Sequence, residues 1–164
     1  MPTPNKNSVS KPYVLLVLLL MLILPVTSTI ISYYNNKIEE PLIMLSGRWF
    51  IFWGLDIRLL TAGLRQAFNP AFTAEKIFHI SDKQSFAVVR ELGFANICMG
   101  AVATVSLFLP QWRTAAAFTG GLFMGIAGIM HIIKKPAGVN EWVAMVSDLF
   151  IFLVVTIYVI TAWQ

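Results

Sequence analysis

Long apolar runs dominate this sequence and restrict what the chain can fold into. Residues 13–32, 92–109, 114–133 and 142–163 contain almost no charged side chains, and a helix needs about 20 such residues to cross a bilayer. The whole chain is 57% hydrophobic and 12% charged, whereas soluble domains average about 45–50% apolar and about 25% charged residues. We therefore predict an integral membrane protein, an all-α helical bundle without a separate soluble domain.

A fifth run, at 49–68, is less apolar because it holds Asp56, Arg58 and Arg65. Its first half is apolar on all sides, whereas a helix lying flat at the interface needs one polar face. We predict that 1–164 forms a single membrane domain with five transmembrane helices, at about 13–32, 49–68, 92–109, 114–133 and 142–163. The alternative is four transmembrane helices plus one interfacial helix at the second run.

The first run follows a polar leader and resembles the start of a secretory signal. A weak cleavage site at 26–28 keeps removal of this segment as an alternative. The apolar run continues past that site through Ile30 and Ile31, which favours an uncleaved anchor.

The lysines and arginines of the short loops predict the orientation, because cytoplasmic loops are enriched in them. With five spans and the N-terminus inside, the outer side holds only Lys37, Arg48 and Arg113. The remaining cations fall on the inner side: Lys6, Lys11, Arg65, Lys76, Lys83, Arg90, Lys134 and Lys135. This bias predicts an inner N-terminus and an outer C-terminus, and it weakens if the second run does not cross. Trp49, Trp53, Trp112, Trp142 and Trp163 lie near the predicted span ends, as interfacial aromatics do.

The longest connection, 69–91, is predicted on the inner side. Asn69-Pro70 favours the start of a short helix, and the segment at 76–83 has the pattern of a short interfacial helix. Ser81-Asp82-Lys83-Gln84 matches a capping box, so we expect the third span to begin near Asp82. Turns at 110–113 and 134–138 predict that the last three helices are neighbours.

Three polar side chains are predicted to meet within the inner half of the membrane. At about 1.5 Å of rise per residue, Arg58 lies roughly 12 Å deep, and Asn96 and Asp148 each about 9 Å deep. An ionisable side chain within a span costs roughly 2.5–3.5 kcal/mol unless it finds a partner or water. Pairing of Arg58 with Asp148 neutralises both, while Asp56 points to a different side of its helix.

A shallower layer is predicted to contain Arg65, Arg90, Glu91, His131 and Glu141. Glu141 and Asp148 are seven residues apart, as are Arg58 and Arg65, so two acids can face two bases. Such pairs hold helices in register where lipid provides no hydrophobic drive. His131 is expected at a protein interface, and a proton relay with Glu91 or Glu141 is the alternative, because histidine titrates near neutrality.

Glycines at helical spacing mark the packing faces. Gly93 and Gly100 lie on the third span, and Gly121, Gly125 and Gly128 on the fourth. Gly121 and Gly125 form a GxxxG pair, which lets helix backbones approach closely in membranes. A homodimer through this glycine face of span four is one arrangement that the pattern allows.

The chain carries no motif for nucleotide, metal or hydrolase chemistry. His79 and His131 lie too far apart for a zinc site, and the cations are scattered rather than gathered in the basic stripe that nucleic acid requires. We therefore expect no catalytic residue, no metal, no cofactor and no nucleic-acid partner; the partner that the composition implies is the lipid bilayer.

Several strings resemble an uncharacterised family of small bacterial polytopic inner-membrane proteins, a domain of unknown function. They are GRWFIFWGLDIRLL, AGLRQAFNPAFTAEKIF, RELGFAN and AMVSDLF, and the resemblance covers 47–158, leaving the first span outside it. It implies a bacterial cytoplasmic membrane and no established activity. It points to these positions for testing: Arg58, Arg65, Gln66, Arg90, Glu91, Asn96, His131, Glu141 and Asp148. Small DoxX-like proteins are similar in architecture only.

Three functions fit these patterns. The first is a non-catalytic structural or accessory bundle held by buried charge pairs. The second is a carrier or binder of a small polar or amphipathic solute, with Arg58, Asn96 and Asp148 at its site. The third is a membrane enzyme or redox accessory with Glu91 and His131 as acid and base, which requires groups that converge within hydrogen-bond reach.

Overall fold

The computed structural model describes residues 10–35 and 40–164, and this part of the chain consists of helices and turns without a β-strand. Two of its long helical rods contain a π-helical stretch. The elements of the first rod are α1 (Lys11–Leu18), η1 (Leu19–Ile23) and α2 (Leu24–Asn35). Those of the second are α3 (Leu42–Phe50), η2 (Ile51–Ile57) and α4 (Arg58–Phe68). They are followed by α5 (Pro70–Lys76), α6 (Ser85–Val105), η3 (Pro110–Trp112), α7 (Arg113–Lys134) and α8 (Val139–Ala162).

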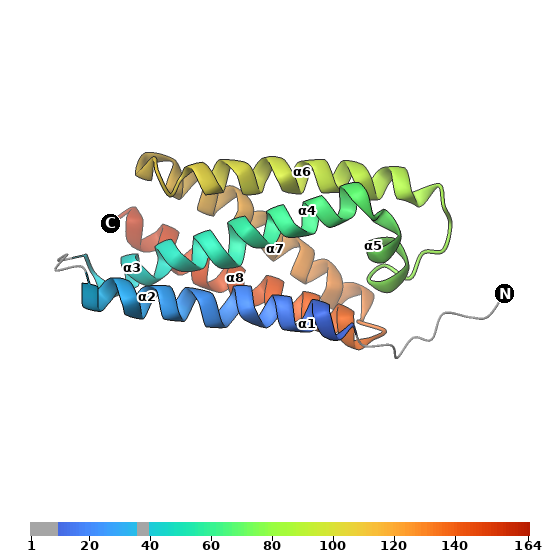
Figure 1. Cartoon of the computed structure of the whole chain (residues 1–164), viewed down its shortest axis with the longest axis horizontal. Helices are drawn as coiled ribbons and strands as arrows, with labels where there is room; N and C mark the ends of the chain where they lie inside the picture. Colours follow the sequence, from blue (N-terminus) through green and yellow to red (C-terminus); the bar gives the residue numbers. More distant parts are fainter. Residues whose placement is uncertain (1–9, 36–39) are drawn as a thin grey trace.

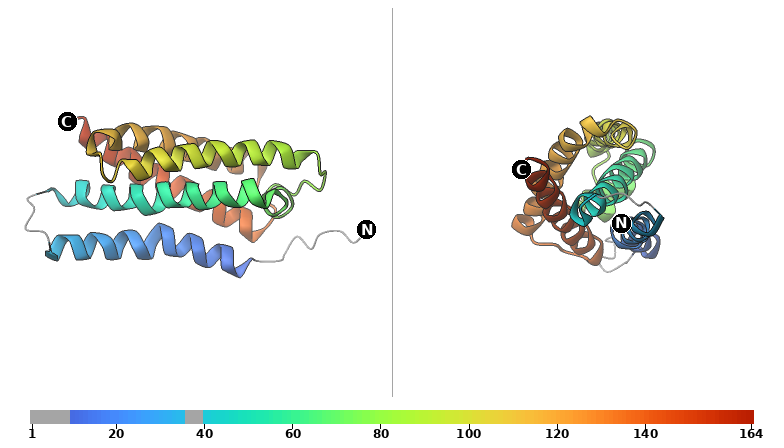
Figure 2. Two further views of the ribbon diagram at one scale, coloured as in Figure 1. Left: turned by 45° about the horizontal axis from the view of Figure 1, so that its top comes forward. Right: turned by 90° about the vertical axis from the view of Figure 1, so that its left-hand side faces the viewer.

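The long rods run side by side with alternating direction, and the short α5 lies across one end of the bundle (Figure 1). We call this end, where α1 begins and α8 begins, the α5 end. Seen along the bundle, the rod at 42–68 lies between the first rod and α6 (Figure 2). It contacts α2, α6, α7 and α8, so it is the central element of the packing.

Four helices are long and apolar enough to cross a membrane: Lys11–Asn35, Ser85–Val105, Pro110–Lys134 and Val139–Ala162. They overlap four of the predicted runs. The helix at 11–35 is longer than the run 13–32 at both ends, whereas those at 85–105 and 139–162 begin and end earlier than the runs 92–109 and 142–163. The second run, at 49–68, lies in a continuous helical rod that reaches back to Leu42. Because this rod contains several charged residues, it is not one of the four helices that are apolar enough to cross a membrane. The count of five spans therefore stays a prediction.

The two π-helical stretches lie against each other in the bundle. Pro25 explains the first, because a proline inside a helix removes one backbone hydrogen bond and its ring collides with the carbonyl four residues earlier. That carbonyl belongs to Met21, within η1. In the second, Gly54 lies where an added Cβ would come 2.8 Å from the Ile151 side chain. Both irregularities therefore occur where helices approach closely.

The first rod is an integral part of the core rather than a peripheral leader. Val17 and Met21 are buried in the hydrophobic core beside Leu55 and Ile151. Two indole N–H groups also tie it to the second rod: Trp49 donates to Ser32 Oγ (2.9 Å) and Trp53 donates to Ser28 Oγ (3.0 Å).

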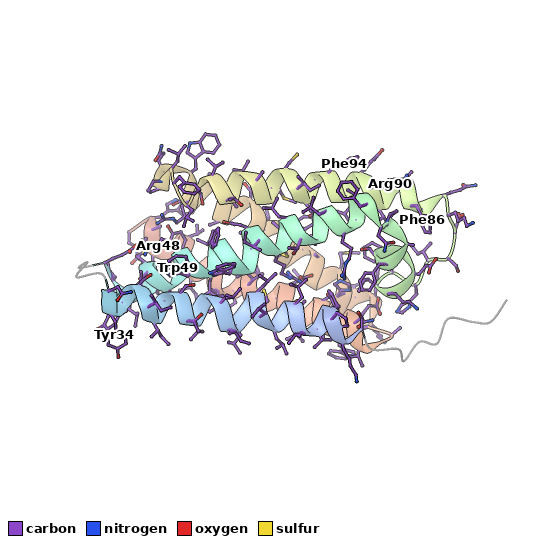
Figure 3. All side chains as sticks on the ribbon, in the orientation of Figure 1. Tyr34, Arg48, Trp49, Phe86, Arg90 and Phe94 are labelled. Carbon is purple, nitrogen blue, oxygen red and sulfur yellow. The ribbon has the colours of Figure 1, made fainter. Side chains whose placement is uncertain are left out.

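The two tryptophans also contribute to helix packing, which the sequence did not predict. The indole groups of Trp49 and Trp53 join two helices of the bundle, with Trp49 lying between α3 and α2 (Figure 3). Their position at a membrane interface stays a prediction. The serines lie four residues apart, as do the tryptophans, so the antiparallel helices match their polar groups in pairs.

The connection at 69–91 differs from the prediction in its middle part. The short helix does start at Pro70, with Asn69 before it, but it ends at Lys76, and the following residues form turns instead of an interfacial helix at 76–83. The third long helix begins at Ser85, three residues later than expected, with Asp82 Oδ1 accepting a hydrogen bond from Gln84 N (3.0 Å). His79 adopts a positive φ of 55° in this stretch, a conformation that interrupts a helix.

All five glycines that the sequence analysis named lie in contacts between helices of this chain. Gly93 and Gly100 face the second rod, whereas Gly121, Gly125 and Gly128 face Val155, Phe152 and Leu149 of α8. The glycine face of α7 is thus filled by the protein's own α8. A homodimer through this face, which stays a prediction, would have to displace those side chains.

Candidate functional site

A cavity of about 180 Å³ lies inside the α5 end of the bundle. Its walls are mostly apolar, formed by side chains such as Leu16, Val17, Leu59 and Phe123. Polar side chains from five helices also reach it: Tyr13, Arg58, Arg65, Gln66, Asn96, His131 and Asp148. The inner-half polar layer predicted from the sequence therefore borders a cavity.

Arg58 and Asp148 form a buried ion pair across this wall. Arg58 Nη2 donates to Asp148 Oδ1 (2.5 Å) and to Ser147 Oγ (2.8 Å), and Nη1 contacts the Met124 sulfur (3.0 Å). The two charged residues are 9% and 6% exposed. Opposite charges in such surroundings must pair, because an isolated buried ion would cost several kcal/mol, and the pair links the second rod to α8.

Asn96 contacts the second rod rather than the ion pair. Its Nδ2 donates to Gln66 Oε1 (2.7 Å), while its own Oδ1 is buried without a hydrogen-bond donor in the described part of the chain. Asn96 is 3% exposed and borders the cavity. A buried amide oxygen without a partner loses about 1–3 kcal/mol of hydration, so a hydrogen-bond donor that reached this atom from the cavity would stabilise the site.

Arg65 lies where the cavity meets α5. Its guanidinium sits over the Phe72 ring, 4.4 Å from the ring centroid, and Phe72 in turn packs against Tyr13 at a centroid distance of 6.0 Å. All three side chains border the cavity. Within residues 10–35 and 40–164, no ion pair or hydrogen bond uses the Arg65 side chain, so its charge has no acidic partner there.

The second predicted charge pair, Arg65 with Glu141, is therefore absent from the described structure. Glu141 pairs with His79, whose Nε2 lies 3.4 Å from Glu141 Oε2, and it also accepts a hydrogen bond from Ala137 N (2.5 Å). The first contact joins the loop that carries His79 to the start of α8, and the second links the turn before α8 to the first turn of that helix. Lys134 Nζ lies 6.0 Å from the centroid of the Phe78 ring and joins the same loops.

The predicted acid–base pair of Glu91 and His131 is not brought together. His131 borders the cavity, but Glu91 is exposed on α6 and is not among the lining residues. Arg90, its neighbour, is also exposed and projects from α6 away from the bundle (Figure 3). The described residues contain no group of three or more His, Cys, Asp or Glu side chains that could hold a metal ion.

Asp56 lies outside the cavity, on the other side of its rod from Arg58. It is 1% exposed, and neither carboxyl oxygen has a hydrogen-bond donor within the described residues. Its backbone oxygen faces Gly100 of α6. This carboxyl group is thus enclosed between helices, away from the polar residues that surround the cavity.

A model of a family of unknown function, DUF6790, matches residues 13–164. The chain belongs to this family. The match includes the first helix, which corrects the expectation that the resemblance begins at Gly47 and leaves the first span outside. No curated protein and no solved structure matches the chain.

Three side chains at or near this site in the DUF6790 chain, Tyr13, His79 and Ser147, were not picked out by sequence reasoning, and Gln66 was indicated only through the family resemblance. Ser147 and Gln66 adjoin predicted site residues in sequence, so proximity to Asp148 and Arg65 was a signal for them. Tyr13 is a polar aromatic residue at the start of an apolar run, a pattern that is also typical of an aromatic anchor at the membrane interface. His79 had no signal, because its approach to Glu141 depends on the path of the loop.

Proposed function

We propose that this chain is a five-span membrane protein that binds a small amphipathic molecule in the cavity at the α5 end. The observation that carries the proposal is the cavity itself, with apolar walls and convergent polar groups, the combination typical of ligand sites. An apolar cavity of about 150 Å³ holds benzene. A volume of about 180 Å³ is slightly larger and therefore suits a single aromatic ring with small substituents.

The second rod is included as a span because of how its charges are placed. Asp56 and Arg58 are buried among neighbouring helices, Arg65 lies toward the α5 end, and Arg48 near the opposite end pairs with Glu40 at 3.4 Å. A helix with its charges turned inward or at its ends can cross lipid at moderate cost. The rod also runs alongside the four apolar helices (Figure 1).

The charge bias of the loops supports an orientation with the α5 end inside. The α5 end contains Lys11, Lys76, Lys83 and Lys134, and the positive-inside rule favours the cytoplasmic side for such an end. Two further lysines that were counted for the orientation, Lys6 and Lys37, lie outside the described residues. We place the protein in a bacterial cytoplasmic membrane with the N-terminus inside and the C-terminus outside. The similarity in architecture to DoxX-like proteins stays a prediction.

The test is binding of benzyl alcohol to the protein in lipid nanodiscs, followed by NMR of ¹³C-labelled methionine methyl groups. Met124 borders the cavity, whereas Met44 does not, so saturable shifts at Met124 alone distinguish a site from partitioning into lipid. Ala127→Leu should fill the cavity and weaken binding by about tenfold or more, since the added methylenes occupy the space. Ala95→Leu, a matched change on the exposed side of α6, should leave it unchanged.

A second candidate is the accessory bundle without a ligand, favoured by the ion pair that Arg58 and Asp148 close with Ser147. The same experiment separates the two functions. In the absence of a binding site, the Met124 signal should shift linearly with the benzyl alcohol concentration, as the Met44 signal does. That result would contradict the binding function and support the accessory bundle, in which the charge pair fixes the relative position of the helices.

A further inference from the structure

We infer that the molecule bound in this cavity is a small organic anion that also carries a neutral hydrogen-bonding group, with Arg65 holding the anion and Asn96 the other group. The inference rests on the proposed binding function and names the class of ligand. Two independent features of the cavity wall carry it: a cation without an acidic partner and a buried amide without its full set of hydrogen bonds, both judged within residues 10–35 and 40–164.

The charges that border the cavity do not cancel. Arg58 and Asp148 neutralise each other through their ion pair, which leaves the Arg65 guanidinium as the remaining full charge on the wall. Contact with the Phe72 ring, 4.4 Å from the guanidinium carbon to the ring centroid, stabilises a cation, and no hydrogen bond within the described residues uses the N–H donors of the Arg65 side chain. Arg65 can therefore offer two parallel N–H groups to a carboxylate, the arrangement in which arginine binds anions most strongly.

Arg58, the residue that sequence reasoning placed first at the site, is less suited to this role. Its Nη2 already donates to Asp148 and Ser147, and its Nη1 contacts Met124. A second anion approaching it would also meet the Asp148 carboxylate at close range, and like charges repel strongly in such surroundings. Arg58 thus positions α8, while Arg65 remains available.

The amide of Asn96 indicates the second group on the ligand. Asn96 and Gln66 share one hydrogen bond, and Asn96 Oδ1 is left without a donor. Turning both amides over would preserve that hydrogen bond and leave the Asn96 NH₂ without an acceptor instead. In either orientation one polar atom of Asn96 is unpartnered, and a hydroxyl group, which both donates and accepts, can satisfy it.

The experiment compares four ligands of matched size in nanodiscs of zwitterionic lipid, with the Met124 methyl as reporter. They are 4-hydroxybenzoate, benzoate, 4-hydroxybenzyl alcohol and 4-hydroxybenzylamine. For the wild type we expect 4-hydroxybenzoate to bind most tightly and the amine most weakly. The neutral alcohol should bind about tenfold or more weakly than the anion, since it cannot form the charge-assisted hydrogen bonds.

Variants then assign the two groups of the ligand to two residues. Arg65→Gln should abolish the preference for the anion over the neutral alcohol, Arg65→Lys should keep most of it, and Arg90→Gln, which removes an exposed cation outside the cavity, should change nothing. Asn96→Leu should remove the preference for 4-hydroxybenzoate over benzoate and leave the anion preference in place.

The ligand order in the wild type alone decides the inference, so a variant that fails to fold does not obscure it. Equal binding of 4-hydroxybenzoate and 4-hydroxybenzyl alcohol would overturn the anion assignment but leave the proposed ligand-binding function intact. If none of the probes bound, benzyl alcohol included, both the inference and the proposed function would be overturned. Displacement of 4-hydroxybenzoate by phosphatidylglycerol added to the nanodiscs would overturn the assignment to a small solute, because it would identify a lipid headgroup as the anion.

Discussion

The two glycine-lined helix contacts of this bundle solve the same packing problem in different ways. Where α4 crosses α6, backbone lies on backbone: an added Cβ on Gly63 would come 2.6 Å from the Gly93 carbonyl oxygen and 2.8 Å from Ile97 N. Where α7 meets α8, each glycine receives a side chain instead. An added Cβ on Gly125 would come 2.7 Å from the Phe152 ring, and one on Gly121 2.9 Å from Val155 Cγ1.

The difference shows that the atoms facing a glycine determine whether the glycine can be replaced by a larger residue. A backbone obstacle can yield only if two whole helices separate, whereas a side chain can change rotamer or shift by a fraction of an ångström. The α4–α6 contact is also the one that places Gln66 against Asn96. We therefore expect the α4–α6 contact, beside the polar wall of the cavity, to be more rigid than the α7–α8 contact on the other side.

The largest effect is expected at the α4–α6 contact. Gly63→Ala should lower the free energy of unfolding by about 3 kcal/mol, since overpacking costs roughly 1–3 kcal/mol and here the backbone cannot move aside. It should also weaken ligand binding at the Met124 reporter, because the helices that carry Gln66 and Asn96 are forced apart. SDS-induced unfolding in mixed micelles measures the first effect. A loss no larger than that of Gly121→Ala would contradict the rigid-contact interpretation.

An intermediate effect is expected for Gly125→Ala. The Phe152 ring must tilt to admit the methyl group, which should cost about 1–2 kcal/mol of unfolding free energy. Phe152→Leu in the same chain should recover part of the loss, so the two changes should be coupled in a double-mutant cycle. Strict additivity of the two single changes would show that the ring does not limit this position.

The smallest effect is expected for Gly121→Ala. Helix propensity favours alanine by roughly 0.5–1 kcal/mol, and the obstacle is a single methyl group of Val155. The net change in unfolding free energy should stay within about 1 kcal/mol of zero, with ligand binding unchanged. A loss as large as that of Gly63→Ala would show that the two contacts are equally rigid and would remove the comparison.

The sequence was sufficient for the class of fold and for part of the site. Uninterrupted apolar runs predict helices that need lipid, because no soluble surface could be made from them, and the described structure is all-helical with four such helices. Helical spacing also identified the glycine faces, and the charge count identified Arg58 and Asp148 as residues that need partners. It did not predict Gly63, which lies in the least apolar run and lacks a second glycine four residues away.

Sequence by itself thus determined which residues share a face of one helix, because the helical repeat fixes that locally. Only the tertiary structure decided which faces meet. In it α8 covers the glycines of α7, Gln66 accepts a hydrogen bond from Asn96, and His79 rather than Arg65 approaches Glu141. The rotation and depth of each helix depend on contacts with its neighbours and on the path of the loops. Within the described residues Arg65 has no acidic partner for that reason, and of the two predicted charge pairs only that of Arg58 with Asp148 is formed there, beside the cavity.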